Sequence, residues 1–74
     1  MTNINKDAQW HSKMVQCCKA RANAYMELAN ADAIEGLDPN ENMLKSQEFW
    51  MRACDHSQTA YMMMIDQLNN GDKK

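Results

Sequence analysis

The sequence predicts an all-α fold: an antiparallel two-helix hairpin that dimerises into a four-helix bundle. Three observations predict it, namely a helix-favouring composition, one turn signal in mid-chain, and a helical spacing of residues on both sides of that turn. The 74 residues include 2 Gly and 1 Pro. Residues that favour the helical conformation are plentiful, namely Ala, Met, Gln, Glu, Lys and Leu. A chain this small forms at most one domain and needs a partner or another staple for stability.

The turn signal is the segment 35–41, which reads Glu-Gly-Leu-Asp-Pro-Asn-Glu. Gly36 suits the left-handed residue that follows a helix end. Asp38 and Pro39 suit the N-cap and the first residue of a second helix. Glu41 lies three residues after Asp38, so we expect it to reach back to the Asp38 amide in a capping box.

These signals divide the chain into one helical-hairpin domain with short ends. The first helix is expected over about 6–35, the turn over 36–38 and the second helix over about 39–69. A connection this short favours antiparallel neighbours. The flanking segments 1–5 and 70–74 are expected to be flexible.

Both expected helices carry residues at alternating spacings of four and three, which align one residue per turn along a single seam. In the first helix the predicted seam is Trp10, Met14, Cys17, Arg21, Ala24, Leu28, Ala31 and Glu35. In the second helix it is Met43, Gln47, Trp50, Cys54, Ser57, Tyr61, Met64 and Leu68. Cys18, Tyr25 and Ala29 are expected to broaden the first seam, and Met51, Gln58 and Ile65 the second.

Polar residues interrupt these seams. Arg21, Gln47 and Ser57 occupy seam positions, and Asp32 lies beside one. A polar seam residue fixes alignment and oligomeric state at some cost in stability. We therefore expect these four residues to control register, with recognition of an external ligand as the alternative.

The second helix has more apolar surface than one neighbouring helix covers, which is typical of a helix buried on several sides. A cyclic dimer is the simplest cover. The Met run 62–64 is expected to fill core gaps, the alternative being an adaptable binding groove. Phe49 and Met63 form the expected exposed patch. The residues expected at an interface with a second copy or another protein are Phe49, Trp50, Ala53, His56, Tyr61, Met63 and Met64.

Charge and length argue against several classes of protein. A net charge of -2 is unlike that of a dedicated nucleic-acid binder. No apolar run approaches the roughly 18–20 residues of a membrane span, and no secretory signal is apparent. The number of cysteines is odd: Cys17, Cys18 and Cys54. An odd number without a secretion signal indicates reduced thiols, so we expect a cytoplasmic protein.

No residue pattern indicates catalysis or a cofactor. Cys54 to Ser57 are consecutive, and neighbours on a helix point about 100° apart, so they do not form a catalytic triad. The three cysteines with His11 and His56 lack the spacing of a zinc site. We therefore expect no catalytic, cofactor-binding or metal-binding residue, no enzymatic activity, and cysteines that act as small buried apolar side chains.

The leading expectation is a non-enzymatic protein–protein interaction module, a regulator, inhibitor or adaptor that works as a homodimer. Small chains of this kind often come from phages, plasmids or small bacterial operons. Two heptad-patterned helices and a short Asp-containing turn resemble, in architecture alone, the Rop-type hairpins of plasmid RNA-binding proteins. That resemblance implies a nucleic-acid-binding dimer as an alternative. Against it, Glu48 and Asp55 lie at helical spacings from Lys45 and Arg52 and are expected to neutralise their charges locally. A metal- or thiol-responsive sensor is the third hypothesis.

Overall fold

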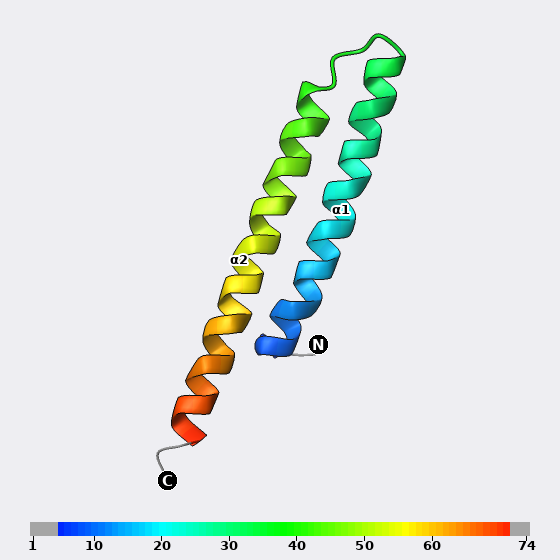
Figure 1. The fold of residues 1–74 in the computed structure, drawn as a ribbon. Helices are drawn as coiled ribbons and strands as arrows, with labels where there is room; N and C mark the ends of the chain where they lie inside the picture. Colours follow the sequence, from blue (N-terminus) through cyan, green and yellow to red (C-terminus); the bar gives the residue numbers. More distant parts are fainter. Residues whose placement is uncertain (1–4, 72–74) are drawn as a thin grey trace.

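The computed structural model describes residues 5–71 as two antiparallel helices, α1 (Ala8–Ile34) and α2 (Asn40–Gly71), which lie side by side (Figure 1). The predicted two-helix hairpin is thereby confirmed. Helix α1 begins after Asp7, whose carboxylate accepts a 2.9 Å hydrogen bond from the Trp10 amide. This contact satisfies an amide left free at the helix start, and it explains why α1 begins two residues after Lys6.

The C-terminal end of α2 extends past the expected boundary. The helix continues through Gly71, so residues 70 and 71 belong to it instead of to a flexible tail. Figure 1 shows that α2 also runs beyond the first turn of α1. The expectations for residues 1–4 and 72–74 lie outside the described residues.

Gly36 ends α1 as predicted, in the left-handed conformation with φ +80°. The Leu37 amide donates to the Asp32 carbonyl at 2.7 Å, and the Gly36 amide donates to the Ala33 carbonyl at 3.2 Å. These two bonds form a Schellman motif, which satisfies carbonyls that a helix end leaves free. The chain therefore turns immediately after α1.

The start of α2 is capped by Asp38, whose carboxylate accepts a 3.0 Å hydrogen bond from the Asn40 amide. The first α-helical bond joins the Met43 amide to the Pro39 carbonyl at 3.0 Å. The expected capping box is wrong in its second half. Glu41 forms a 3.5 Å ion pair with Lys45, one turn along the exposed surface, instead of reaching back to the Asp38 amide.

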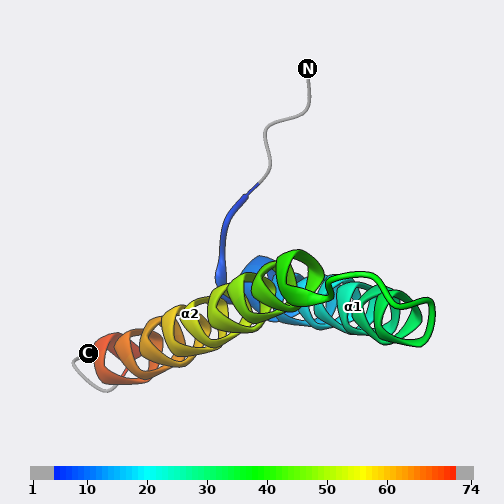
Figure 2. The same ribbon diagram turned by 90° about the horizontal axis from the view of Figure 1, so that it is seen from above.

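The two helices form a single layer, with a shortest principal extent of 12 Å for the Cα trace. Seen from above, α1 and α2 cross at a shallow angle, and within residues 5–71 no further helix covers either broad side of the pair (Figure 2). Domains are normally built from at least two packed layers around a core. Between residues 5 and 71, neither helix contains a segment long and apolar enough to cross a lipid bilayer.

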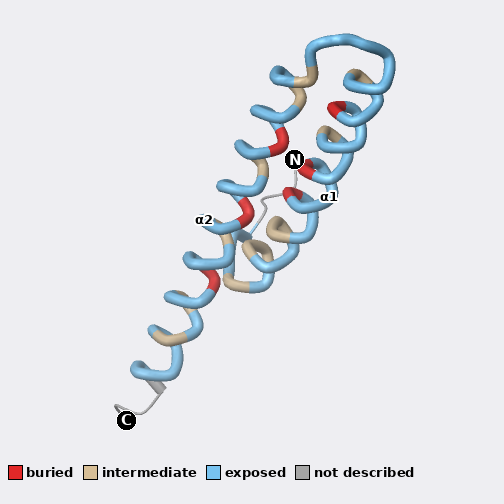
Figure 3. Tube along the Cα trace, turned by 45° about the horizontal axis from the view of Figure 1, so that its top comes forward, coloured by how far each residue is buried: buried red, intermediate tan, exposed pale blue. Residues whose placement is uncertain are grey.

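The contact between the helices is built from small side chains. Figure 3 shows the buried positions on the facing sides of α1 and α2. On α1 the buried residues are Cys18, Ala22 and Ala29, and on α2 they are Ser46, Ala53 and Ala60.

The predicted seams are therefore one residue out of register in both helices. On α1 the contact face follows Cys18, Ala22 and Ala29. Cys18 and Ala29, which were expected to broaden the seam, are thus confirmed as buried, whereas Cys17, Arg21 and Leu28 of the seam itself are exposed. The physical reason is size, because helix axes approach closely only where the facing side chains are small. Larger seam residues hold the axes farther apart, and Leu28 and Tyr61 lie outside the contact, whereas Trp10 packs against His56 at the open end.

Candidate functional site

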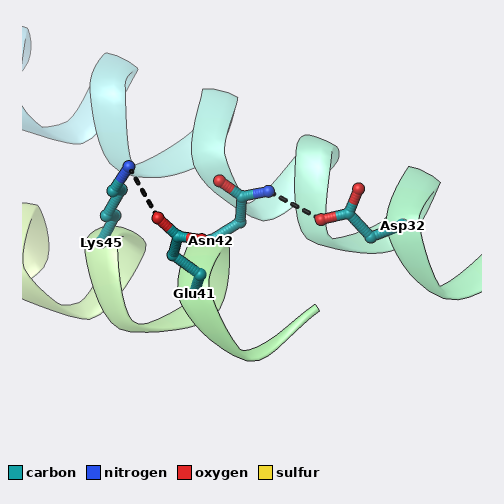
Figure 4. A network of polar contacts seen from close by, with 4 residues as sticks. All are labelled: Asp32, Glu41, Asn42 and Lys45. Atoms are coloured by element: carbon teal, nitrogen blue, oxygen red, sulfur yellow. Dashed lines mark hydrogen bonds and ion pairs between the residues drawn. The ribbon is translucent and has the colours of Figure 1, made fainter. Parts of the chain in front are cut away.

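Three cross-helix polar contacts align the hairpin along its length. Near the turn, the Asn42 side-chain amide donates to an Asp32 carboxylate oxygen at 2.7 Å (Figure 4). In the middle, the Ser46 hydroxyl donates to the Ala22 carbonyl at 2.8 Å, and Ser46 is fully buried. Asp32 thus lies on the contact face, where a polar contact between the helices favours one alignment over others.

The third contact joins two histidines near the open end of the hairpin. The Nδ1 atoms of His11 and His56 lie 2.9 Å apart, one from each helix, and both side chains are half-buried. The Trp10 ring packs edge-on against both imidazoles, with centroid distances of 4.8 Å to His11 and 5.5 Å to His56. This group places two imidazoles, a side-chain type able to bind metal ions, in direct contact.

One lateral side of the hairpin carries an arginine–aromatic cluster of Arg21, Tyr25, Lys45, Phe49 and Arg52. Tyr25 and Phe49 stack across the helices with centroids 5.6 Å apart. Arg21 and Arg52 lie 5.9 and 5.0 Å from the Phe49 centroid, and Lys45 lies 5.6 Å from that of Tyr25. Cation–π attraction of this kind contributes about 0.5–1 kcal/mol at exposed sites.

The opposite lateral side of α2 carries exposed apolar residues at helical spacing. We call them the outer stripe: Met43, Trp50, Cys54, Tyr61, Met64 and Leu68. These residues belong to the seam predicted for α2, and in the structure they face solvent. Tyr61 and Leu68 are 62% and 70% exposed, so the outer stripe is an unpartnered face of the hairpin.

A shallow groove runs between the outer stripe and α1. Its larger part has a volume of about 660 Å³, with Val15 and Lys19 of α1 on one wall and Trp50, Cys54 and Tyr61 of α2 on the other. A second part of about 300 Å³ continues along the same side past Ser12, Gln16 and Met64. The groove is open and mainly apolar, which suits a packed helix better than a small polar ligand.

A second exposed apolar row, which we call the back row, lies on the part of α2 turned away from α1. It consists of Leu44, Met51 and Met62, which are between 60% and 68% exposed. The expectation that the Met run fills the core is wrong within the hairpin for Met62 and Met64, because both are exposed. Met63 is half-buried. Together the outer stripe and the back row leave most apolar surface of α2 facing solvent.

The residues predicted for an interface separate into three groups. Trp50, Tyr61 and Met64 lie on the outer stripe. Ala53 lies inside the hairpin with 3% exposure, so its assignment to an outer interface is wrong. The remaining three, Phe49, His56 and Met63, are half-buried.

The exposed patch predicted at Phe49 and Met63 is also wrong, because Phe49 is partly covered by Tyr25. Among the predicted register residues, Arg21, Gln47 and Ser57 are exposed and lie outside the contact between the helices. Asp32 alone of the four bridges the helices through Asn42. These corrections follow from the same one-residue shift.

Cys54 and His56 lie close in the sequence, and the structure gives their side chains different surroundings. The His56 ring contacts His11 and Trp10 instead of Cys54. Cys17 and Cys54 are exposed thiols and Cys18 is buried, which corrects the expectation of buried cysteines for two of the three. Between residues 5 and 71 no three His, Cys, Asp or Glu side chains gather around one point.

Sequence reasoning missed Ser46, Asn42 and the histidine contact. A signal for them was present, because small residues recur seven apart at Ala22 and Ala29 and again at Ala53 and Ala60. A seven-residue repeat of small side chains indicates a close helix contact. The seams of larger residues have equally regular spacing, and sequence periodicity alone does not rank the two.

Comparisons with known proteins leave the fold and the surface as the basis for inferring function. No protein-family model, curated protein or solved structure matches this chain.

Proposed function

We propose that this protein is a non-enzymatic protein–protein interaction module that acts as a homodimeric four-helix bundle. The observation that carries the proposal is the outer stripe, a row of large apolar side chains exposed along most of α2. Exposed Gln47 and Ser57 interrupt this row, and an exposed apolar row of this length is typical of interaction surfaces. The hairpin itself buries mainly small side chains, so its larger apolar residues are free to pack against another chain.

The exposed area also supports a second copy as the partner. The chain exposes 6127 Å², whereas a compact monomer of 8.5 kDa exposes about 4,700 Å². The excess of roughly 1,400 Å² is larger than the approximately 800 Å² that each partner buries in a standard interface. A dimer of hairpins therefore has enough uncovered surface to form an interface of standard size.

A twofold arrangement fits the distribution of that surface. The outer stripe runs from Met43 to Leu68 along one side of α2, and cyclic dimers are the commonest soluble oligomers. Packing the outer stripe of one hairpin against that of another makes α2 central and α1 peripheral. It also adds a second layer of helices, which the single hairpin lacks.

The dimer is tested by sedimentation equilibrium at micromolar concentration with three variants. Trp50→Glu and Tyr61→Glu each place a charge in the outer stripe and are expected to give folded or partly folded monomers. Thr59→Glu is the matched control, because Thr59 is exposed and lies outside the outer stripe. A wild-type chain that remains a stably folded monomer across the concentration range contradicts the proposal.

The back row supplies the surface for a different protein once the outer stripe is covered. Leu44, Met51 and Met62 are exposed, and Met side chains adapt well to varied partners. The proposal is tested by affinity capture with wild-type, Met51→Glu/Met62→Glu and Thr59→Glu baits. One protein retained by the wild type and the control and lost with the double variant supports a target; identical captures from all three contradict it.

Nucleic-acid binding is a second candidate, favoured by the arginine–aromatic cluster. The ion pair found among residues 5–71 joins Lys45 to Glu41, so Arg21 and Arg52 have no carboxylate partner in that part of the chain. Unpaired guanidinium groups suit phosphate contacts. An RNA mobility shift that weakens steeply with salt, and is lost in Arg21→Gln/Arg52→Gln, supports this candidate; no shift at low salt removes it.

Three free thiols suit a reducing compartment, and the proposal accordingly places the module in the cytoplasm. The open, mainly apolar groove favours binding over catalysis.

A further inference from the structure

The contact between His11 and His56 has the geometry of two ligands of one metal ion. The two side chains come from opposite helices, and their Nδ1 atoms are 2.9 Å apart. Their ring planes are inclined by 38°, with centroids 5.1 Å apart. Because the backbones of α1 and α2 already hold the two nitrogens together, binding an ion between them needs no movement of either helix.

The distance between the nitrogens matches a chelate. Metal–nitrogen bonds to histidine are about 2.0–2.1 Å long, so two such bonds at a right angle separate the nitrogens by about 2.9 Å. A tetrahedral angle separates them by about 3.3 Å for the same bond length. In the metal-free pair the two Nδ1 atoms face each other. Small rotations of the two rings direct both Nδ1 lone pairs toward one shared point, where the ion binds.

We propose that His11 and His56 form a two-histidine site for a late divalent transition-metal ion, of the class of Ni²⁺, Cu²⁺ and Zn²⁺. Imidazole nitrogen is a preferred ligand of these ions. In the metal-free pair one Nδ1–H donates to the other Nδ1. On binding, that proton moves to Nε2 of the same ring, so both rings stay neutral and both Nδ1 lone pairs bind the ion.

Two protein ligands leave the remaining coordination positions to water. Structural zinc sites have four protein ligands and are closed, so this site is open and exchanges its ion with solvent. The half-buried position beside Trp10 keeps water from one side of the pair. The Lys6 ammonium lies 5.4 Å from the Trp10 centroid, and its positive charge lowers the affinity.

Trp10 makes the site observable, because its ring contacts both imidazoles. The experiment titrates Ni²⁺ into a Trp50→Phe chain, in which Trp10 is the remaining tryptophan, since the sequence contains 2. A paramagnetic ion at this distance quenches indole fluorescence. We expect quenching that saturates at one Ni²⁺ per chain, is reversed by EDTA, and is relieved when diamagnetic Zn²⁺ displaces the nickel.

Matched variants separate this site from the thiols. In His11→Gln and in His56→Gln, each in the Trp50→Phe background, we expect the apparent affinity for Ni²⁺ to fall by at least about tenfold, because one ligand of the chelate is gone. Cys17→Ser/Cys54→Ser removes the exposed thiols and is expected to quench like its parent. Circular dichroism of each variant checks that the hairpin is folded.

An NMR measurement on the unmodified chain tests the same site without any substitution. The sequence contains 2 His, so substoichiometric Ni²⁺ is expected to broaden both sets of imidazole resonances together. The proposal is overturned if quenching does not saturate, if it persists unchanged in the histidine variants, or if Ni²⁺ broadens neither set of imidazole signals.

Discussion

The Ser46 hydroxyl donates a 2.8 Å hydrogen bond to the Ala22 backbone carbonyl, joining the two helices where both residues are 0% exposed. This contact requires α1 and α2 to approach closely, because the short Ser side chain reaches the backbone of the opposite helix. It therefore defines the register of the hairpin as well as its spacing. A longer side chain at position 46 removes both features.

The first prediction concerns Ser46. Ser46→Ala keeps the small volume and loses one hydrogen bond, so we expect the free energy of unfolding to fall by about 0.5–1.5 kcal/mol. Ser46→Leu adds volume to a close contact and is expected to cost about 1–3 kcal/mol. Urea unfolding at one fixed protein concentration measures both, since the stability of a dimer depends on concentration. Equal losses in the two variants contradict a contact limited by size.

The second prediction tests the small-residue face with leucine substitutions. Ala53 is 3% exposed, so Ala53→Leu forces the helices apart and is expected to destabilise the hairpin by about 1–3 kcal/mol. Ala20 is exposed on α1, and Ala20→Leu is expected to change the stability by less than about 0.5 kcal/mol. Thermal unfolding compares the two. A stable Ala53→Leu chain implies that the larger residues form the seam after all.

The third prediction concerns the hydrogen bond between Asp32 and Asn42, which are 2.7 Å apart at their side-chain atoms. A double-mutant cycle with Asp32→Ala and Asn42→Ala is expected to give a coupling energy of about 0.5–1.5 kcal/mol. The same cycle for Asp32 with exposed Gln47 serves as the control and is expected to give a value near zero. Additive effects in the first cycle show that the contact does not align the helices.

The fourth prediction concerns Gly36, whose φ of +80° is unfavourable for residues with a side chain. A Cβ at this position meets no atom within 4 Å, so the cost of Gly36→Ala is backbone strain alone, about 1–2 kcal/mol. Gly36→Asn is expected to cost less, because Asn tolerates the left-handed conformation. Chemical unfolding of both variants gives the comparison, and equal stabilities would argue against strain as the cause.

The fifth prediction tests whether Arg21 contributes to the contact between the helices. Arg21 is exposed and lies 5.9 Å from the Phe49 centroid, so Arg21→Leu is expected to reduce stability by less than about 1 kcal/mol. If Arg21 controls the register, as the sequence pattern predicts, Arg21→Leu instead changes the oligomeric state. Light scattering of Arg21→Leu decides between them, with Arg21→Lys as the charge-preserving control.

The sequence by itself determined the hairpin. Few helix breakers and one turn signal left room for two helices and a short connection. Gly36 and Asp38 act locally, through hydrogen bonds to residues within a few positions. Local interactions of this kind depend on residue identity and spacing, which a sequence displays directly.

The tertiary structure alone decided which face of each helix is covered. Two seams, one residue apart, share the same spacing in both helices, and periodicity does not distinguish them. The seam with Ala22 and Ala53 packs inside the hairpin because small side chains permit a close approach. As a result, Trp50 and Tyr61 remain exposed, and His11 meets His56 across the contact. These placements depend on the relative rotation of two helices, which is set by their packing against each other.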